Sequence, residues 1–467
     1  MVVFLVEISY LIYYIVTMKT AIDYKRKSFI PSLSSLAFPL IIENLLRVAL
    51  SSTDVFMLSG YSQSAVAAIG FISQFTFFLI SLHSVIGVGV SILIAQYIGA
   101  QRIDEAKKVS QAGTFMTLVL GSILAILFTA LTFPLLSLYK LDAEVKRYAM
   151  QYLLIFNSMS IFSAFGVLFG AILRSYGYAH IVMVASIFSG ILNIIGNAMS
   201  LYGLFGCPII GVPGVAFSTV FSQIGGCIIL WTAIRRHKNV NYSLSEIFRV
   251  SAYFRRKILS IGIPTVGETI LWSSSQIVII SMITMFGTSS ISAFTYLNVL
   301  LRFVFTISSS MGSAVQIKIG MYCGAGQKDT AYHKLFGYQL IGTAISIIMV
   351  VSLFFARTLI IPFFTKDAEI LSLIYSLLPV CIVQEFGRSI NIITIPALKG
   401  AGDIKFPVLI GILSMWIVSV GAGALLSIVF KLELFGILCM MSADECVRGI
   451  LSMLRWKSKA WQVKQLI

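Results

Sequence analysis

Charged residues are scarce in this chain of 467 amino acids. Asp, Glu, Lys and Arg make up 11% of it, whereas hydrophobic residues make up 58% and the mean hydropathy is +0.95. A soluble globular domain has about 25% charged residues, so the chain lacks the polar surface that a soluble protein needs. A disordered chain is excluded as well, because this much apolar surface does not stay solvated. The composition predicts a polytopic membrane protein.

Cysteine and histidine are sparse too. The six cysteines lie far apart without a CxxC pair, and the four histidines are scattered. This spacing argues against a metal cluster and against a disulfide framework. We therefore expect neither.

Motifs of membrane enzymes and ATP-driven pumps are missing. The sequence contains no Asp-rich Mg²⁺ motif, no HExxH, no GxSxG and no Walker loop. These motifs would bind a catalytic metal, present a nucleophile or hold a nucleotide phosphate. We expect no enzymatic activity and no cofactor.

Long apolar runs are abundant instead. A helix that crosses a bilayer needs about 20 mostly apolar residues. Twelve segments meet this requirement: 33–58, 65–98, 109–133, 148–172, 181–203, 213–234, 257–286, 290–320, 334–356, 370–397, 406–430 and 434–454. The predicted fold class is all-α, with twelve transmembrane helices.

The longest polar stretch, from Arg235 to Lys257, divides these segments six and six. The sequence therefore predicts five parts: a cytoplasmic or interfacial segment at 1–30, an N-lobe at 31–234, a cytoplasmic linker at 235–256, a C-lobe at 257–456 and a cytoplasmic tail at 457–467.

The first 18 residues fit none of the spans. Val2–Val16 is too short to cross a bilayer comfortably, Glu7 interrupts it, and no positive charge precedes it as in a signal peptide. We interpret this stretch as an interfacial helix, or as the result of a start codon placed upstream of Met18.

The net charge of +16 fits a membrane protein with basic cytoplasmic loops. When alternate loops are assigned to the inside, 25 Lys and Arg residues fall there and 6 fall on the opposite side. This bias predicts a multi-pass protein of the plasma (inner) membrane with both termini in the cytoplasm. Membrane lipids are then expected partners, and the charge needs no nucleic acid to explain it. No obligatory protein partner is evident.

The chain repeats itself at one constant offset. The shift that converts Pro39 to Pro264 also converts Glu43 to Glu268, Gly99-Ala100 to Gly324-Ala325, Arg174 to Lys399 and Gly177 to Gly402. Each half contains six predicted spans, and after an even number of crossings the chain is back on the side where it started. Both halves therefore enter the membrane in the same orientation. We therefore expect two six-helix bundles related by a pseudo-twofold axis along the membrane normal, as in transporters with parallel repeats.

The repeated segments carry motifs at corresponding places. Prolines open the first span of each half, and Ser52-Thr53-Asp54 follows in the first. Ala95–Ala100 leads into a charged turn, and the fourth spans end in Leu173–Gly177 and Leu398–Asp403. In order, spacing and duplication, this pattern resembles the multidrug and toxic compound extrusion (MATE) family over nearly the whole chain. The resemblance implies a secondary antiporter.

Three ionisable residues of the first span share one stripe of the helix: Glu43, Arg47 and Asp54. Glu43 and Arg47, four residues apart, can neutralise each other. Asp54 is left without a local partner, and it matches the first-span Asp of the family, which belongs to an N-lobe cation or proton site.

The fifth span offers Asn193 and Asn197. In the family branch whose N-lobe site is best defined, the second of these positions is Asp. An amide does not exchange a proton at physiological pH, so the resemblance leaves a shared-proton carboxylate pair in question here. The two amides could still orient a cation or support Asp54.

The seventh span carries Glu268, followed at helical spacing by Trp272 and Gln276, with no basic residue within a turn. Burial disfavours an ionised carboxylate, so a group of this kind can exchange a proton near neutral pH. A structural Glu that another helix caps, for instance through Arg302, is the alternative. Relatives often place a functional Glu in this span, so Glu268 is the first candidate.

The tenth span holds Glu385 and Arg388. Some relatives use an acidic residue of this span in a C-lobe cation site, which implies a role for Glu385. The fixed charge of Arg388 would compete with a bound ion. Asp444 and Glu445 of the last span are expected near a helix end and receive no role.

Two functions therefore stay open. The first is export of small organic, often cationic, compounds by antiport with H⁺ or Na⁺. The second is a flippase for lipid-linked oligosaccharides, which some distant relatives of the family resemble. A flippase would need cationic side chains to hold a pyrophosphate, and Arg47, Arg302 and Arg388 are the intramembrane arginines that could supply them.

Overall fold

The described part of the chain consists of helices and the loops that join them, and no strand occurs in it. The structure is a computed structural model that describes residues 30–464 and 466–467. The predicted interfacial segment within residues 1–18 lies outside this range. Among the described helices, ten are long and apolar enough to cross a membrane, and eleven if the bent pair α5–α6 counts as one span. The all-α membrane fold is confirmed, and the number twelve stays a prediction.

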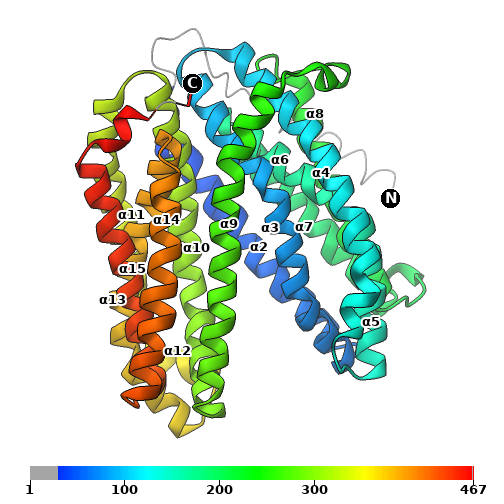
Figure 1. Cartoon of the computed structure of the whole chain (residues 1–467). Coiled ribbons are helices and arrows are strands. Elements are labelled where there is room, and N and C mark those ends of the chain that lie inside the picture. The colour runs from blue at the N-terminus through cyan, green and yellow to red at the C-terminus, as the bar shows by residue number, and fades with distance from the viewer. Residues whose placement is uncertain (1–29, 465) are drawn as a thin grey trace. The chain divides into compact units, whose positions relative to one another are not determined.

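The chain divides into two compact units, Met1–Ile263 (unit 1) and Pro264–Ile467 (unit 2). The helices of each unit can be followed in Figure 1. Unit 1 contains, in its described part, α2 (Leu33–Ser59), α3 (Gln63–Gly99), α4 (Ile103–Ser137), α5 (Ala143–Ser158), α6 (Ile161–Ser175), α7 (Ala179–Tyr202), η1 (Leu204–Gly206), α8 (Val212–Arg236), η2 (Leu244–Arg249) and the first turns of α9 (Ala252–Thr284).

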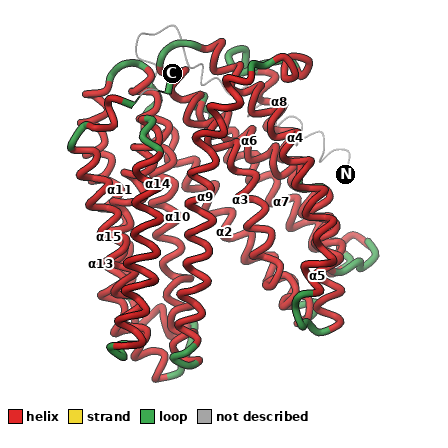
Figure 2. The backbone as a smooth tube through the Cα atoms, viewed as in Figure 1, coloured by secondary structure: helices red, strands yellow, loops and turns green. Residues whose placement is uncertain are grey.

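The boundary between the units falls inside α9, at Pro264. Unit 2 contains the rest of α9 and then α10 (Thr288–Gly324), α11 (Lys328–Phe355), α12 (Arg357–Ile360), η3 (Ile361–Phe363), α13 (Ala368–Ala401), α14 (Lys405–Ser414), the π-helical segments η4 (Met415–Ala422) and η5 (Leu425–Val429), α15 (Glu433–Lys457) and η6 (Ala460–Val463). Loops join the helices mainly at the two ends of each unit (Figure 2).

Local sequence explains several helix ends. The side chains of Ser62 and Asp367 accept hydrogen bonds from the first backbone amides of α3 and α13, which would otherwise be unpaired. Gly177 and Gly402 follow the ends of α6 and α13 with φ of 86° and 102°. Residues with a β-carbon rarely adopt this conformation. The fourth helix of each repeat therefore ends at an equivalent glycine.

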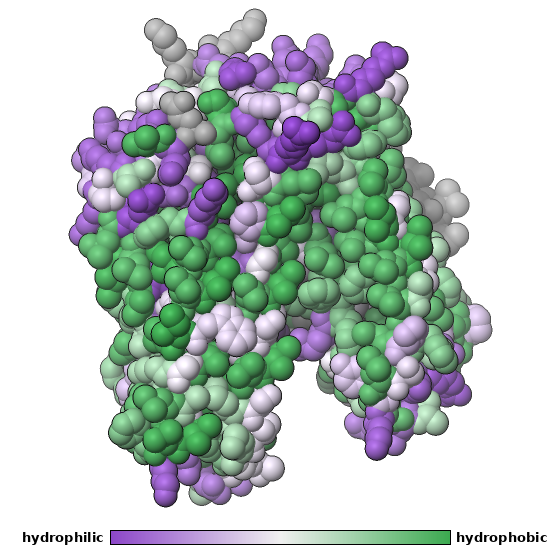
Figure 3. All heavy atoms as spheres, in the orientation of Figure 1, coloured by the Kyte–Doolittle hydropathy of each residue, from purple (hydrophilic) through white to green (hydrophobic). Residues whose placement is uncertain are grey.

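Each unit is organised around a few helices. In unit 1, α7 packs against α2 and α8, and α3 packs against α4 and α6. In unit 2, α13 is central and packs against α10, α11 and α15. Apolar side chains such as Leu58, Ala68, Leu297 and Leu378 fill the cores. Hydrophobic side chains also cover the middle of each unit, and hydrophilic ones gather at its ends (Figure 3), as expected of surfaces that face lipid.

Two of the predicted spans are less regular than expected. The span predicted at 148–172 is broken into α5 and α6, which meet at an angle of 53°. Asn157, at the end of α5, donates hydrogen bonds to the Phe128 carbonyl and the Thr132 hydroxyl of α4, which holds α5 beside α4. The span predicted at 406–430 becomes π-helical from Met415 onward, and the sequence carries no periodicity that predicts this change.

Close helix packing in unit 2 depends on Gly312 of α10. A β-carbon at this position would overlap the carbonyl oxygen of Ile392 in α13. We expect Gly312→Ala to lower stability by about 1–3 kcal/mol, the usual effect of overpacking a close contact. The unfolding temperature of the purified protein in detergent measures this.

The matched control is Gly337→Ala in α11, where a β-carbon meets nothing within 4 Å. This variant should keep the unfolding temperature or raise it slightly, because Ala is the better helix former. Equal losses in the two variants would contradict the assigned contact.

Candidate functional site

A cluster of polar side chains joins α2 and α7 inside unit 1. The Nδ2 of Asn197 donates to Oδ1 of Asp54 at 2.7 Å and lies 3.4 Å from Oδ1 of Asn193. The Nδ2 of Asn193 in turn donates to the Thr219 hydroxyl of α8 at 3.2 Å. The two amides that the sequence places one turn apart thus lie beside the carboxylate of Asp54. We call these four residues the Asp54 cluster.

The Asp54 cluster has acceptor capacity to spare. Asn197 is fully buried, and its Oδ1 has no hydrogen-bond partner among the described residues. A buried acceptor without a donor is unfavourable, and a cation beside it removes that cost. Carboxylate, amide and hydroxyl oxygens are the ligands that hard cations prefer. The cluster can therefore hold a proton on Asp54 or a small cation beside it.

Glu43, which also lies on α2, is bound by two arginines. Its Oε1 accepts from Arg47 Nη2 at 3.0 Å, and its Oε2 accepts from Arg174 Nη1 at 3.1 Å. The side chain of Arg47 is 67% exposed, whereas that of Arg174 is 20% exposed. The predicted Glu43–Arg47 pair is present, but Arg174, which lies beyond the predicted span 148–172, is the more buried partner.

Glu268 is not the unpaired carboxylate that the sequence suggested. Lys399, in the last turn of α13, donates to its Oε2 at 2.6 Å, and both side chains are largely buried. The expectation of an isolated group was wrong because the base lies 131 residues away along the chain. Arg302, named as a capping partner, is exposed on α10 and makes no ion pair among the described residues.

The two ion pairs are equivalent under the repeat. Glu43 and Arg174 are 131 residues apart, as are Glu268 and Lys399. The shift that converts Pro39 to Pro264 also converts the first pair to the second. In each unit a carboxylate of the first helix of the repeat therefore binds a base at the end of the fourth.

A larger group of charges connects α13 with α15 in unit 2. Arg388 donates to Glu385 and, through Nε at 3.2 Å, to Glu445. Glu445 also accepts from Asn391 Nδ2 at 2.8 Å and from Arg448 Nη2 at 3.2 Å.

The same Arg448 nitrogen lies 2.7 Å from Asp444 Oδ2. We call this group, together with the Glu268–Lys399 pair, the charged network of unit 2.

The structure corrects what the sequence led us to expect of three members of this network. Asp444 and Glu445 were expected near a helix end, but α15 begins at Glu433, so both lie in its middle and are buried. Arg448, to which the sequence analysis gives no role, is 7% exposed inside the unit. The signal in the sequence was the spacing of Asp444 and Arg448 by four residues, which allows an ion pair within a helix.

The charged network is not balanced. Its carboxyl groups are Glu268, Glu385, Asp444 and Glu445, and its basic groups are Arg388, Lys399 and Arg448. Four acids face three bases. Glu385 is fully buried, and its Oε2 has no partner among the described residues. Since a buried unpaired charge is costly, this oxygen is the natural place for a proton or a monovalent cation.

Trp272 and Gln276 complete the residues that the sequence singled out. Trp272 is 39% exposed, and Gln276 is partly buried one turn further along α9. No hydrogen bond or ion pair joins either side chain to Glu268 among the described residues. The structure thus brings Asp54 together with Asn193 and Asn197, and it shows no such link for Trp272 and Gln276 in its described part.

Comparison with known sequences gives one consistent family. The MatE family profile matches residues 39–199 and again residues 264–425. The two matches begin at Pro39 and Pro264, which are equivalent prolines of the internal repeat. Each match falls within one unit.

Two relatives align along nearly their whole length. An uncharacterized transporter, YisQ, of Bacillus subtilis is 34% identical over 92% of this chain and 94% of its own. A probable multidrug resistance protein, NorM, of Thermotoga maritima is 25% identical over 95% of this chain and 97% of its own.

A solved structure of a MATE protein in a bent conformation has the same fold. It superposes with a TM-score of 0.84 at 21% identity, over 91% of this chain and 94% of that chain. This confirms a fold of two lobes.

Lys399 provides a test of the buried ion pair. Lys399→Met leaves the Glu268 carboxylate buried without its base, so we expect it to lower stability by about 3–5 kcal/mol. Lys399→Arg should stay close to wild type, because Arg already fills the equivalent position 174. The unfolding temperature in detergent reports both effects.

Lys405→Met, which removes an exposed lysine of α14, serves as the control and should be nearly neutral. Glu268→Gln added to Lys399→Met should recover much of the lost stability, since it removes the unpaired charge. If Lys399→Met is no worse than Lys405→Met, the ion pair has been assigned wrongly.

Proposed function

We propose, from the fact that this chain belongs to the MatE family of membrane transporters, that it exports small organic, often cationic, compounds in exchange for H⁺ or Na⁺. Relatives named as probable multidrug resistance proteins support this substrate class. The chain would sit in the plasma membrane with both termini in the cytoplasm, as the distribution of Lys and Arg predicts.

The Asp54 cluster carries the proposal. It combines one carboxylate, a second acceptor without a donor and two further polar side chains on α2, α7 and α8. Position 279, equivalent to Asp54 in the second repeat, is an isoleucine, so this site exists in unit 1 alone. An ionisable group within a membrane span is expensive and is retained for a function. Asp54 is the coupling residue that the geometry favours first.

The charged network supplies a second site of the same kind. Its excess of one acid means that a proton or a cation must accompany it when it is buried. Glu385 offers the free oxygen, and Arg388 holds the opposite oxygen of the same carboxyl group. Arg388 thus orients Glu385 and is itself neutralised by Glu445. In this proposal Glu268 and Glu43 do not bind the coupling ion directly, because each is paired with a base, and they contribute by positioning that base.

Coupling follows from differential binding. If the ion binds one arrangement of the transporter more tightly than the other, its gradient shifts the populations of the two. Loss of the ion from Asp54 would favour the arrangement that binds the exported compound. No covalent step and no cofactor are required.

The arginines give the flippase alternative less support than the antiporter receives from its acidic residues. Its pyrophosphate would need several free cationic groups, but Arg388 binds Glu385 and Glu445, and Arg47 binds Glu43. Arg302 alone, of these three, has no acidic partner among the described residues.

The first test is transport by Asp54→Asn. Purified protein in liposomes, with ethidium as the organic cation, is exposed to a pH gradient and to a Na⁺ gradient in separate experiments. Wild type should move ethidium under one of them. Asp54→Asn should lose at least nine-tenths of this movement, because the amide cannot take up the ion.

Asp142→Asn is the matched control, since Asp142 is exposed before α5 and its side chain makes no capping hydrogen bond. It should transport like wild type. Both variants should unfold at nearly the wild-type temperature. Undiminished ethidium movement by a folded Asp54→Asn protein would overturn the assignment of Asp54.

The second test addresses Glu385. A ligand that binds only the folded state raises its stability, so the coupling ion should raise the unfolding temperature of the wild type. Glu385→Gln should reduce this response while it keeps or raises the temperature without the ion, because it removes the unbalanced charge.

Glu369→Gln changes an exposed residue in the first turn of the same helix and should respond like wild type. A full ion response in Glu385→Gln would remove Glu385 from the proposed site.

A further inference from the structure

Unit 1 contains an apolar cavity that the proposed transport sites do not use. Its volume is about 430 Å³, within the range of small-molecule sites. Side chains of α4, α6, α8 and η2 line it, and the lining includes Phe165, Phe169, Trp231 and Phe248. Apolar cavities of this kind exclude water and accept apolar ligands.

A polar pocket of about 370 Å³ adjoins the cavity. It is lined by polar or charged side chains throughout: Lys107, Gln111, Arg235, Asn241, Tyr242, Ser243 and Glu246.

The wall between the cavity and the pocket is formed by two residues. The Tyr242 hydroxyl lies 2.6 Å from the Thr114 hydroxyl, which faces the apolar cavity. The ring of Tyr242 also packs edge-on against Trp231, with centroids 5.8 Å apart. The apolar cavity and the polar pocket therefore lie on the two sides of this hydroxyl pair.

The charges available in the polar pocket favour an anion. Lys107 has no ion pair or hydrogen bond among the described residues. Arg235 uses one nitrogen on the Tyr242 carbonyl, at 3.1 Å, and keeps its other donors. The Glu246 carboxylate is occupied by Gln111 Nε2 at 2.7 Å and by the backbone amide of Ser243. Two basic groups thus stand against one acid that is already hydrogen-bonded.

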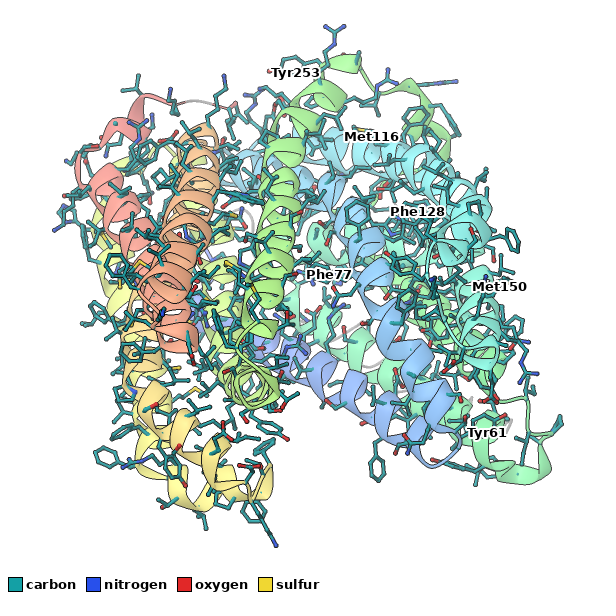
Figure 4. All side chains as sticks on the ribbon, turned by 60° about the horizontal axis from the view of Figure 1, so that its bottom comes forward. Tyr61, Phe77, Met116, Phe128, Met150 and Tyr253 are labelled. Atoms are coloured by element: carbon teal, nitrogen blue, oxygen red, sulfur yellow. The ribbon has the colours of Figure 1, made fainter. Side chains whose placement is uncertain are left out.

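The position of the two spaces fits the headgroup level of a membrane. They lie at the end of unit 1 where the linker runs, the end at which Figure 4 shows Tyr253, opposite the end that carries Tyr61. Aromatic residues concentrate at membrane interfaces. Beside the pocket, Phe248 is 66% exposed and its ring packs against Phe115, while Arg249 next to it is exposed as well.

A ligand for both spaces needs an apolar chain that ends in an anionic group. We propose that unit 1 binds one anionic phospholipid, with an acyl chain in the apolar cavity and its phosphate group on Lys107 and Arg235. The lipid would tie the linker segment η2 to α4 and α8. This site is separate from the Asp54 cluster, and its test does not depend on transport.

The test is lipid binding to the full-length protein after delipidation in detergent. Phosphatidylglycerol should raise the unfolding temperature and remain bound as a one-to-one adduct in native mass spectrometry. Phosphatidylcholine with the same chains should bind at least severalfold more weakly. Lys107→Gln should weaken phosphatidylglycerol binding about tenfold, the effect of losing one charge-assisted hydrogen bond, and weaken phosphatidylcholine binding less, because the choline cation already offsets the phosphate charge of that lipid.

Two control variants, one for the polar pocket and one for the apolar cavity, test whether the effects are specific to each space. Lys108→Gln removes the exposed neighbour of Lys107 and should bind lipid like wild type. Ile228→Trp fills the apolar cavity from its exposed rim and should weaken the binding of both lipids. Its control is Ile123→Trp, at an exposed position of α4 outside the lining, which should weaken the binding of neither lipid.

Four results would overturn the proposal. Equal binding of both lipids would show that the pocket does not select an anionic headgroup, and equal effects of Lys107→Gln and Lys108→Gln would remove Lys107 from the site. Inorganic phosphate that stabilises the protein as much as phosphatidylglycerol would make the pocket a simple anion site. Displacement of the lipid by ethidium, one for one, would identify the cavity as part of the transport route instead.

Discussion

A charge buried in a membrane protein needs a partner, and most of this structure's polar chemistry follows from that constraint. Outside water the ionised carboxylate loses its hydration, and only a base, a donor or a bound ion restores the balance. Both repeats meet this requirement in the same way. Glu43 binds Arg174 in unit 1, and Glu268 binds Lys399 in unit 2. Each pair joins the first helix of its repeat to the end of the fourth, where Gly177 or Gly402 ends the helix.

The places where pairing is incomplete are then the informative ones. Asp54 is held by an amide rather than a base, and the charged network of unit 2 has one acid too many. In our proposal, an exchangeable ion resolves both. The two units differ in the residues proposed to hold the ion, since the repeat preserves the Glu–base ion pairs but not Asp54.

Sequence reasoning reached the fold and part of the site. Apolar length and the constant offset of the internal repeat predicted the helices and two equivalent halves, because burial in lipid demands long apolar runs. The stripe with Asp54 and the spacing of Asn193 and Asn197 were also readable from helical periodicity. The partners of Glu43 and Glu268 were not, because the bases lie 131 residues away, just beyond the predicted spans 148–172 and 370–397. The repeat already contained this information, since it paired Glu43 with Glu268 and Arg174 with Lys399. The buried role of Glu445 was missed because its partners Arg388 and Asn391 lie 57 and 54 residues away on α13.

The central claim is that organic cation and coupling ion move in opposite directions through one cycle. The most direct measurement uses liposomes that contain the protein and start without any ion gradient. An ethidium gradient is imposed, and internal pH and internal Na⁺ are recorded as ethidium runs downhill. The account predicts that one of the two ions moves uphill against ethidium, in a fixed ratio to it. Ethidium flux with neither ion displaced would show an uncoupled carrier and contradict the account.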